Sequence, residues 1–364
     1  MNLRPSSLPP QLLGLATAVP PHVLDQSRAS EFIGSIYGQR IAGYGALARV
    51  FASTGIERRY LAEPLEWFAQ ERGFTERSES YLRASCDIFR EVVADALANA
   101  GLAAAAIDDV VMVSSTGIAT PSIDARVLPE MGFRDDVHRL PVFGLGCAAG
   151  VTGLAIASRI ARSRPGATVL LVTIELCSLA FRPDRATKKD LVSTALFGDG
   201  AAAAILRCGD DPGLVSLGGA TEHLWANTLD MMGWSTDEVG LGVILSRSLP
   251  AFITREFRSE YDRAMARIDV DPASIERVVC HPGATRVLEA IESSMDLPAG
   301  ALDSERSVMR DYGNMSSPTV LFVLERTIAE GFHGRAMLAA MGPGFTATFV
   351  EADVPRGSRG MAAA

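Results

Sequence analysis

The sequence predicts an α/β protein, because short apolar runs alternate with stretches of helical composition. Asp109–Thr116, Val169–Thr173, Ala201–Leu206 and Arg277–Pro282 have the length and the apolar content of buried strands. A helical stretch, Gly150–Arg164, precedes the second of these runs. Because strand–helix–strand units pack as a sheet covered by helices, this alternation predicts at least one mostly parallel sheet.

The chain length indicates two halves. A chain of 364 residues exceeds the size at which a single hydrophobic core usually stops growing. A strand, a chemically reactive residue and a helix occur in order over 141–164 and again over 277–294. Because the turn sequence at 210–213 lies near the middle, we expect halves of 1–209 and 210–364. Duplicated halves would bring the two reactive residues together at a shared interface.

Composition excludes several classes of function. The formal net charge of −9 argues against nucleic acid as the main partner, since phosphate backbones require concentrated Lys and Arg. Five scattered cysteines without a CxxC pair do not form the pattern of a zinc site or a disulfide framework. Neither a secretory signal nor an apolar run long enough to cross a membrane is visible. A reducing cytoplasm is therefore the expected location.

Cys147 is the strongest candidate nucleophile. The segment Pro141–Gly150 runs from apolar residues through glycines to the cysteine, and a small-residue helical stretch follows. This order predicts a strand-to-helix turn, where free backbone N–H groups and the helix dipole stabilise a thiolate. A buried core cysteine is the alternative role, but it gives no reason for the surrounding glycines. We therefore interpret Cys147 as catalytic.

His281 and Asn314 are candidate partners of that thiol. His281 ends a predicted strand and precedes Pro282-Gly283, the position where α/β folds place ligand chemistry. Asn314 lies shortly before the helical stretch Val320–Ala329. There it could serve as a helix N-cap or donate its amide to a developing oxyanion. Spacing alone leaves both roles open.

Several motifs in order resemble one enzyme family. They are Gly146-Cys147-Ala-Ala-Gly150, Ala195-Leu-Phe-Gly-Asp-Gly-Ala-Ala202, Cys280-His281-Pro-Gly283, Tyr312-Gly-Asn-Met-Ser-Ser-Pro318 and Gly342-Pro-Gly-Phe-Thr346. From about Leu12 to Val354 the chain resembles type III polyketide synthases, the chalcone-synthase-like branch of the thiolase superfamily. The resemblance implies a thiolase-like five-layered α/β/α/β/α fold built from two duplicated halves. It also implies a homodimer with an independent active site in each subunit.

The resemblance implies a mechanism. Cys147, His281 and Asn314 would form a Cys-His-Asn triad in which Cys147 holds the starter acyl group as a thioester. His281 would keep the sulfur as a thiolate. His281 and Asn314 would then stabilise the enolate that forms as malonyl-CoA loses CO2. No metal or organic cofactor is implied, because CoA enters as part of the acyl-CoA and malonyl-CoA substrates.

The cavity residues implied by the resemblance are mostly small. Phe197 matches the family's gatekeeper phenylalanine, and Val243 stands where the family has a second one. Other cavity positions fall on Ser115, Thr120, Cys177, Ala180, Ser316 and the loop residues Gly342, Pro343 and Gly344. Such a cavity would favour a long fatty acyl starter and alkylpyrone or alkylresorcinol products. Tetrahydroxynaphthalene-type synthesis from malonyl-CoA alone, or an aromatic starter, is the alternative.

The residues that bind the CoA phosphates are less defined. Arg49 matches one basic contact of the family, although a solvated helix charge is an equal alternative. Ala46 and Ser53 stand where family lysines are expected. Arg58-Arg59 is an alternative basic pair.

Three other functions compete with this prediction. A ketoacyl synthase III also uses Cys, His and Asn, but it performs one condensation. A papain-like protease uses the same residue types, but it has disulfides and a cysteine near the mature N-terminus. A catalytically inactive binding protein would not need all three residues intact.

Overall fold

The computed structural model describes residues 8–209 and 212–357. Nine of the described strands form one sheet, in the spatial order β11-β12-β13-β8-β1-β7-β6-β4-β5. These strands are β1 (Pro10–Ala18), β4 (Asp109–Val113), β5 (His138–Val142), β6 (Thr168–Leu176), β7 (Asp199–Cys208), β8 (Val215–Leu224), β11 (Arg277–Cys280), β12 (Gly334–Gly342) and β13 (Thr346–Val354).

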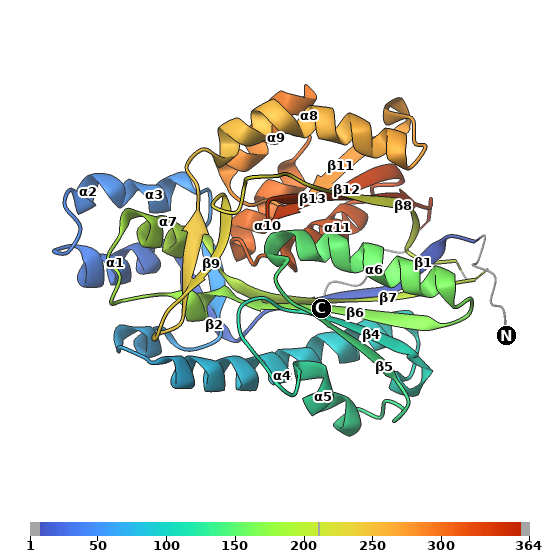
Figure 1. Cartoon of the computed structure of the whole chain (residues 1–364), viewed down its shortest axis with the longest axis horizontal. Coiled ribbons are helices and arrows are strands. Elements are labelled where there is room, and N and C mark those ends of the chain that lie inside the picture. The colour runs from blue at the N-terminus through green and yellow to red at the C-terminus, as the bar shows by residue number, and fades with distance from the viewer. Residues whose placement is uncertain (1–7, 210–211, 358–364) are drawn as a thin grey trace.

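Helices cover both outer faces of this sheet and fill the space between its two halves (Figure 1). On one outer face lie α4 (Phe74–Ala100) and α5 (Ile123–Val127), and on the other lie α8 (Leu249–Arg267) and α9 (Thr285–Met295). Between the halves lie α6 (Ala149–Ser163) and α11 (Thr319–Ala329). The predicted five-layered α/β/α/β/α fold is therefore confirmed. Pairing of β1 with β8 joins the two half-sheets along one edge.

The strands alternate between two apolar environments. In β4, Val110 and Met112 belong to the core cluster that includes α4, whereas Val111 and Val113 belong to the cluster around α6 and α11. Successive side chains of a strand point to opposite faces, so a strand buried on both faces must be apolar throughout. This requirement explains the continuous apolar runs in the sequence.

The expectation of a mostly parallel sheet is wrong, because the sheet is mixed. The pairs β4–β5, β4–β6 and β11–β12 are parallel. The pairs β1–β7, β1–β8, β6–β7, β8–β13 and β12–β13 are antiparallel. The connection from β12 to β13 is only three residues long, and a connection that short can join only antiparallel strands.

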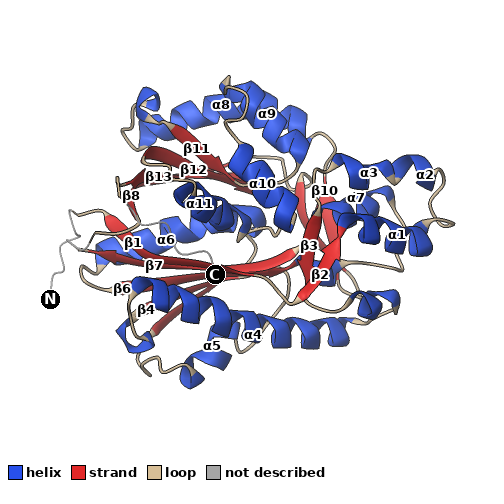
Figure 2. Cartoon of the chain, turned by 180° about the vertical axis from the view of Figure 1, so that it is seen from behind, coloured by secondary structure: helices blue, strands red, loops and turns tan. Residues whose placement is uncertain are grey.

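The remaining elements gather beside the sheet at one end of the molecule (Figures 1 and 2). They include the helices α1 (Gln26–Tyr37), α2 (Tyr44–Leu47), α3 (Arg49–Ser53) and α7 (Lys188–Leu196), and the two-stranded pairs β2 (His22–Asp25) with β3 (Arg58–Leu61) and β9 (Met232–Thr236) with β10 (Leu241–Leu245). A further helix, α10 (Asp303–Tyr312), precedes α11.

Residues 210 and 211 of the predicted junction lie outside the described residues, so the division at 209/210 stays a prediction. None of the described helices is long and apolar enough to cross a membrane.

Candidate active site

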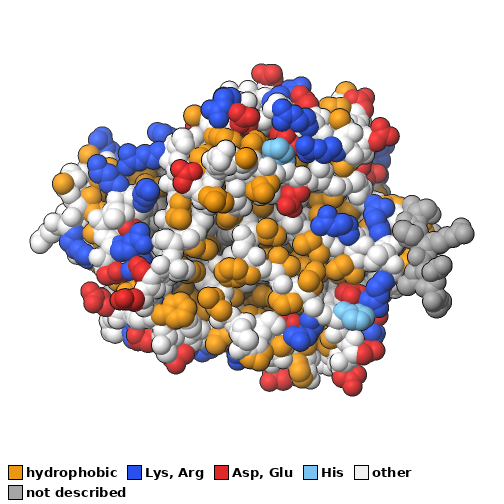
Figure 3. Space-filling model, viewed as in Figure 1, with side chains coloured by type: hydrophobic (Ala, Val, Ile, Leu, Met, Phe, Trp, Pro, Cys, Tyr) orange, Lys and Arg blue, Asp and Glu red, His pale blue; other side chains and the backbone are white. Residues whose placement is uncertain are grey.

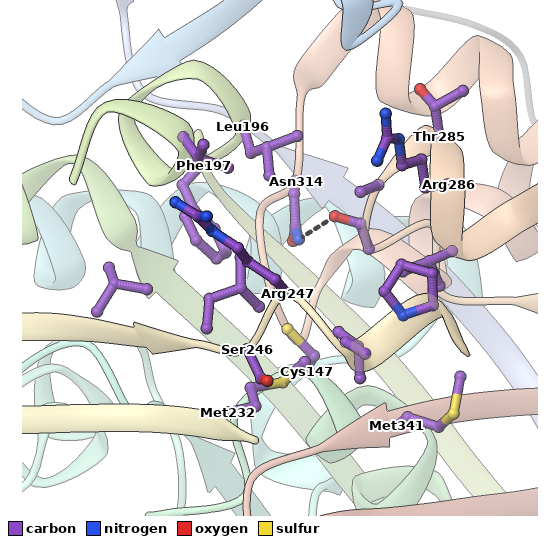
Figure 4. A pocket seen from close by; sticks show the side chains of 18 of the residues that line it. Cys147, Leu196, Phe197, Met232, Ser246, Arg247, Thr285, Arg286, Asn314 and Met341 are labelled. Carbon is purple, nitrogen blue, oxygen red and sulfur yellow. Dashed lines mark hydrogen bonds between the residues drawn. The ribbon is translucent and has the colours of Figure 1, made fainter. Parts of the chain in front are cut away.

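Cys147, His281 and Asn314 line the same pocket, which has a volume of about 680 Å³. Cys147 comes from the turn before α6, His281 from the end of β11, and Asn314 from the segment between α10 and α11. Figure 4 shows Cys147 and Asn314 among the side chains that surround this cavity. The prediction that Cys147 and His281 lie close together is therefore confirmed.

The turn that carries Cys147 is a single 3₁₀ turn, Gly146–Ala148, which leads directly into α6. Gly146 has φ +47°, a left-handed conformation that favours glycine. Ser115 supports the turn, because its Oγ accepts hydrogen bonds from the backbone N–H groups of Gly144 (3.2 Å) and Gly146 (3.3 Å). The predicted placement of Cys147 before a helix N-terminus is confirmed.

The Cys147 thiol is only 6% exposed. Burial raises its pKa to about 12, and the buried carboxyl of Glu175 acts in the same direction. Ser316 opposes this rise in pKa, because its hydroxyl lies 3.4 Å from Sγ and can donate a hydrogen bond to a thiolate. The Ser316 hydroxyl is therefore a hydrogen-bond partner of the candidate nucleophile.

His281 is also buried, and neither of its ring nitrogens has a hydrogen-bond partner among the described residues. Burial lowers the pKa of His281 to about 4, which favours the neutral imidazole. An unpaired polar atom in a buried site costs free energy unless a ligand satisfies it. Two unpartnered nitrogens on a pocket wall are therefore free to bind or exchange protons with a substrate.

Asn314 is held by hydrogen bonds at both ends of its amide. Its Nδ2 donates to the backbone oxygen of Gly283 (2.9 Å), and its Oδ1 accepts from the backbone N–H of Ser316 (2.8 Å). The second N–H of Nδ2 has no acceptor among the described residues. The alternative role as a helix N-cap is wrong, because α11 begins at Thr319 with Pro318 as its N-cap.

Gly283 connects Asn314 to His281. An added Cβ at Gly283 would lie 3.8 Å from the imidazole Nε2 of His281, so the glycine packs beside the ring. The same glycine accepts the Asn314 amide hydrogen bond. His281 and Asn314 are thus placed around one shared backbone segment.

Phe197 and Val243 separate the main pocket from a smaller cavity of about 60 Å³, and both side chains line both spaces. Phe197 ends α7 and forms an isolated backbone bridge with Asn314. The gatekeeper position therefore adjoins the candidate catalytic amide through the backbone.

The other predicted cavity residues lie in different places in the structure. Cys177, Ser316 and Pro343 line the main pocket, and Ala180 lines the smaller cavity. Ser115 instead supports the Cys147 turn from behind, and Thr120 is exposed in the loop after β4. The prediction that Ser115 and Thr120 line the cavity does not hold for the single chain.

The loop between β12 and β13 packs directly against the Cys147 turn. A Cβ added at Gly342 would lie 2.4 Å from the Leu145 carbonyl and 2.6 Å from the Ala148 nitrogen. Gly342 therefore cannot carry a side chain without displacing the turn. Gly344 has φ +105°, a conformation that also favours glycine.

Several exposed cations border the same pocket. Arg49 lines it as predicted, and the sequence analysis missed the others, which are Lys188, Lys189, Arg247 and Arg286. None of these cations has an ion pair among the described residues. Only Lys188 and Lys189, which are adjacent, form a basic cluster that could have been noticed in the sequence. Figure 3 shows Lys and Arg side chains gathered where α2 and α3 lie. The alternative pair Arg58-Arg59 does not line this pocket.

Comparison with known proteins identifies relatives along nearly the whole chain. The family models for the N-terminal and C-terminal domains of "Chalcone and stilbene synthases" match residues 4–212 and 217–350. A 1,3,6,8-tetrahydroxynaphthalene synthase of Streptomyces peucetius subsp. caesius is 37% identical over 92% of this chain and 90% of its own length. A putative chalcone synthase of Bacillus subtilis (strain 168) is 32% identical over 92% of this chain and 96% of its own length.

A solved structure shows the same architecture. The crystal structure of 1,3,6,8-tetrahydroxynaphthalene synthase from Streptomyces coelicolor A3(2), a bacterial type III polyketide synthase, superposes with a TM-score of 0.90 at 28% identity. The match covers 95% of this chain and 99% of that protein.

Proposed function

The chain belongs to the chalcone and stilbene synthase family, whose members are type III polyketide synthases and hence acyltransferases, and we propose that Cys147, His281 and Asn314 are its catalytic residues. The observation that carries this proposal is their shared position on one buried pocket. A thiol at a helix N-terminus, a buried imidazole and an amide with a free N–H supply a nucleophile, a base and an oxyanion donor.

In the first step, Cys147 attacks the thioester carbonyl of the starter acyl-CoA. The thiol proton passes to a ring nitrogen of His281, which then gives it to the departing CoA sulfur, so CoA leaves as its thiol and the acyl group remains on Cys147. Moving a proton between two buried partners leaves the net charge of the pocket unchanged. The attraction between thiolate and imidazolium then offsets part of the desolvation that each ion would incur alone. Ser316 further supports the thiolate by hydrogen bonding.

In the second step, malonyl-CoA loses CO2 and forms an enolate whose carbon attacks the acyl thioester. This attack makes the new carbon–carbon bond and frees the Cys147 thiolate. The charge that develops on the enolate oxygen needs preorganised donors in a site without water. His281 and the free N–H of Asn314 are the donors that we assign to it. The reaction draws on no metal or organic cofactor.

We assign the CoA phosphates to the unpaired cations that border the pocket. Arg49 lies on α3, Lys188 and Lys189 begin α7, Arg247 follows β10, and Arg286 lies on α9. Cations without carboxylate partners create a local positive potential on a chain whose formal net charge is −9. A diphosphate and a ribose phosphate would be attracted to such an opening.

For the starter we propose a fatty acyl group. The main pocket is lined mostly by apolar side chains, and only Cys177, Phe197 and Val243 line both it and the smaller cavity. Because Val243 stands where the family has a second phenylalanine, an alkyl chain could pass between these side chains. Each buried methylene would contribute about 0.8 kcal/mol to binding.

A second candidate reaction is synthesis from malonyl-CoA alone. Several relatives at 30–37% identity are named 1,3,6,8-tetrahydroxynaphthalene synthases. Such a reaction would use malonyl-CoA both as starter and as extender, and the smaller cavity would have no role in it.

Mass spectrometry of products tests both proposals. The enzyme is incubated with malonyl-CoA alone and with octanoyl-, decanoyl-, dodecanoyl- or palmitoyl-CoA added, with C147A as the blank. Alkylpyrone or alkylresorcinol masses that follow the starter length support the fatty acyl proposal. Tetrahydroxynaphthalene from malonyl-CoA alone, with no alkyl product, supports the second candidate and contradicts the first. A single condensation product would instead indicate chemistry of the ketoacyl synthase III kind.

We also propose that the chain acts as a homodimer in the cytoplasm. The edge strand β5 and the loops beside it expose large apolar side chains at Ile118, Leu140 and Phe143. Exposed apolar side chains gathered at a sheet edge are typical of a covered interface. Sedimentation equilibrium would show a species of twice the chain mass, and a monomer at micromolar concentration would contradict this proposal.

A further inference from the structure

The C-terminus of α7 has its backbone carbonyls satisfied by groups outside the helix. The last four carbonyls of a helix have no partner within it and attract positive charge. The Arg59 guanidinium donates from one terminal nitrogen to the carbonyls of Thr194 and Phe197. Gln26 Nε2 donates to the carbonyl of Ala195 (2.9 Å). The backbone N–H of Asn314 donates to the carbonyl of Leu196 (2.9 Å).

Arg59 is a buried cation that forms no salt bridge among the described residues, although the buried carboxyl of Asp199 acts on its charge. It is 2% exposed, and none of the described carboxylates lies within ion-pair distance of it. Its second terminal nitrogen donates to the Gln26 side-chain oxygen (2.8 Å), and its Nε has no partner among the described residues. Burial lowers its pKa to about 10, so the guanidinium stays charged at neutral pH. Taking a charge out of water is unfavourable, and the helix-end carbonyls together with the Asp199 carboxyl offset part of that cost.

The Arg59 side chain also fills the space beside two glycines that flank the candidate site. An added Cβ at Gly198 would lie 3.0 Å from Arg59 Cβ, and one at Gly313 would lie 3.4 Å from Arg59 Cδ. Gly198 follows Phe197, and Gly313 precedes Asn314. Two backbone hydrogen bonds of 2.9 Å bridge these segments. The Asn314 N–H donates to the Leu196 carbonyl, and the Gly198 N–H donates to the Asn314 carbonyl. Arg59 therefore packs against the place where the segment after α7 is bridged to the segment that carries Asn314.

We infer that Arg59, held by Gln26, is a positioning residue that fixes Asn314 and Phe197 relative to Cys147. Arg59 lines the smaller cavity beside Phe197 but not the main pocket that holds Cys147 and Asn314, so it acts on those residues through the α7 end and the Phe197–Asn314 bridge. Arginine suits this position because its planar group donates to several carbonyls at once, which a lysine ammonium cannot reproduce in the same geometry. The inference rests on the role proposed for Asn314 in malonyl-CoA decarboxylation.

The test separates decarboxylation from the reactivity of the thiol. In a C147A background, conversion of malonyl-CoA to acetyl-CoA and CO2 is measured for R59K, N314A and the double variant. With Cys147 intact, the rate of Cys147 alkylation by iodoacetamide is measured for R59K. We expect R59K to slow decarboxylation about tenfold or more and to leave alkylation within twofold of the wild-type rate.

The double variant identifies the route of the effect. If Arg59 acts through Asn314, R59K will have little further effect once N314A is present, whereas independent roles would give additive losses. R58K is the matched control, because Arg58 is the exposed neighbour on β3 and should leave decarboxylation unchanged.

Three results would overturn the inference. Additive losses in the double variant, or equal losses of decarboxylation and alkylation in R59K, would make Arg59 merely structural while leaving the role of Asn314 intact. An unchanged decarboxylation rate in N314A would overturn the role of Asn314 and this inference with it. If circular dichroism shows R59K to be unfolded, Q26L replaces it, with the same selective loss expected at smaller magnitude.

Discussion

Pro343 packs against Gly146, the residue before the candidate nucleophile. A Cβ added at Gly146 would lie 2.8 Å from Pro343 Cδ, and the backbone at Gly146 has φ +47°. The two residues are far apart in the sequence, so this contact exists only because the β12–β13 loop of one half closes over the Cys147 turn of the other.

Gly146→Ala should therefore destabilise the protein and abolish most condensation activity. The left-handed conformation costs a non-glycine residue about 1–2 kcal/mol, and overpacking adds about 1–3 kcal/mol. Chemical denaturation and product formation measure the two effects. Gly144→Ala is the control, since Gly144 also has positive φ (+94°) but no atom within 4 Å of an added Cβ. Equal losses in both variants would show that the Pro343 contact is unimportant.

Ser316→Ala should raise the pKa of the Cys147 thiol. The Ser316 hydroxyl lies 3.4 Å from Sγ, and a hydrogen bond to a charged group contributes about 1.5–3 kcal/mol. We expect iodoacetamide to alkylate Cys147 about tenfold more slowly at a fixed pH near neutrality. Ser246→Ala is a matched control, because Ser246 lines the same pocket while its hydroxyl pairs with Ser248. An unchanged alkylation rate in S316A would contradict this prediction.

Val243→Phe should restrict the enzyme to shorter acyl starters. Val243 lines both the main pocket and the smaller cavity, so a phenyl ring there would block the passage between them. Products from dodecanoyl- and palmitoyl-CoA should decline at least tenfold relative to products from acetyl-CoA. Ile244→Phe serves as the control, because Ile244 lines only the main pocket. A parallel decline with every starter would indicate a general packing defect instead.

Arg286→Gln should weaken binding of CoA thioesters without changing the chemical step. Arg286 borders the pocket and has no ion pair among the described residues, so its charge is available to a phosphate. We expect the KM for malonyl-CoA to rise severalfold, with kcat within twofold, and the salt dependence of KM to become weaker. Arg258→Gln is the control, because Arg258 pairs with Asp262 away from the pocket. A fall in kcat alone would argue against a phosphate contact.

Glu305→Gln should make stability less dependent on pH. Burial raises the pKa of Glu305 to about 7 in the folded state, compared with about 4.3 in an unfolded chain. Between these values the folded state binds more protons, so the free energy of unfolding falls as pH rises from about 4 to 7, by about 3 kcal/mol for this group. Glutamine retains an acceptor for the Cys280 N–H, which Glu305 holds at 3.0 Å.

The measurement is urea denaturation of both proteins at pH 5 and pH 8. The wild type should lose stability between these pH values, and E305Q should lose less and exceed the wild type at pH 8. Glu175 and Asp199 also have pKa values raised to about 7 by burial, so part of the wild-type slope should remain. A steeper slope in E305Q would contradict the assigned direction of the Glu305 pKa.

Much of the fold and one part of the site can be predicted from the residues alone. Strands buried on both faces must be apolar at every position, so runs such as Asp109–Val113 are visible without a structure. Cys147 can be identified because its turn packs closely against other residues and therefore requires neighbouring glycines, which are visible in the sequence. Requirements of strand burial and turn geometry act on neighbouring residues, so they can be recognised from the sequence.

The roles that depend on distant segments are visible only in the folded chain. Asn314 precedes a helix in the sequence, yet it bonds to Gly283 and bridges to Phe197 and does not cap that helix. In the sequence Arg59 is half of an alternative basic pair for the CoA phosphates, but the fold buries it under the end of α7. Hydrogen bonds and close contacts between segments that are distant in the sequence depend on chain topology, and no local pattern records them.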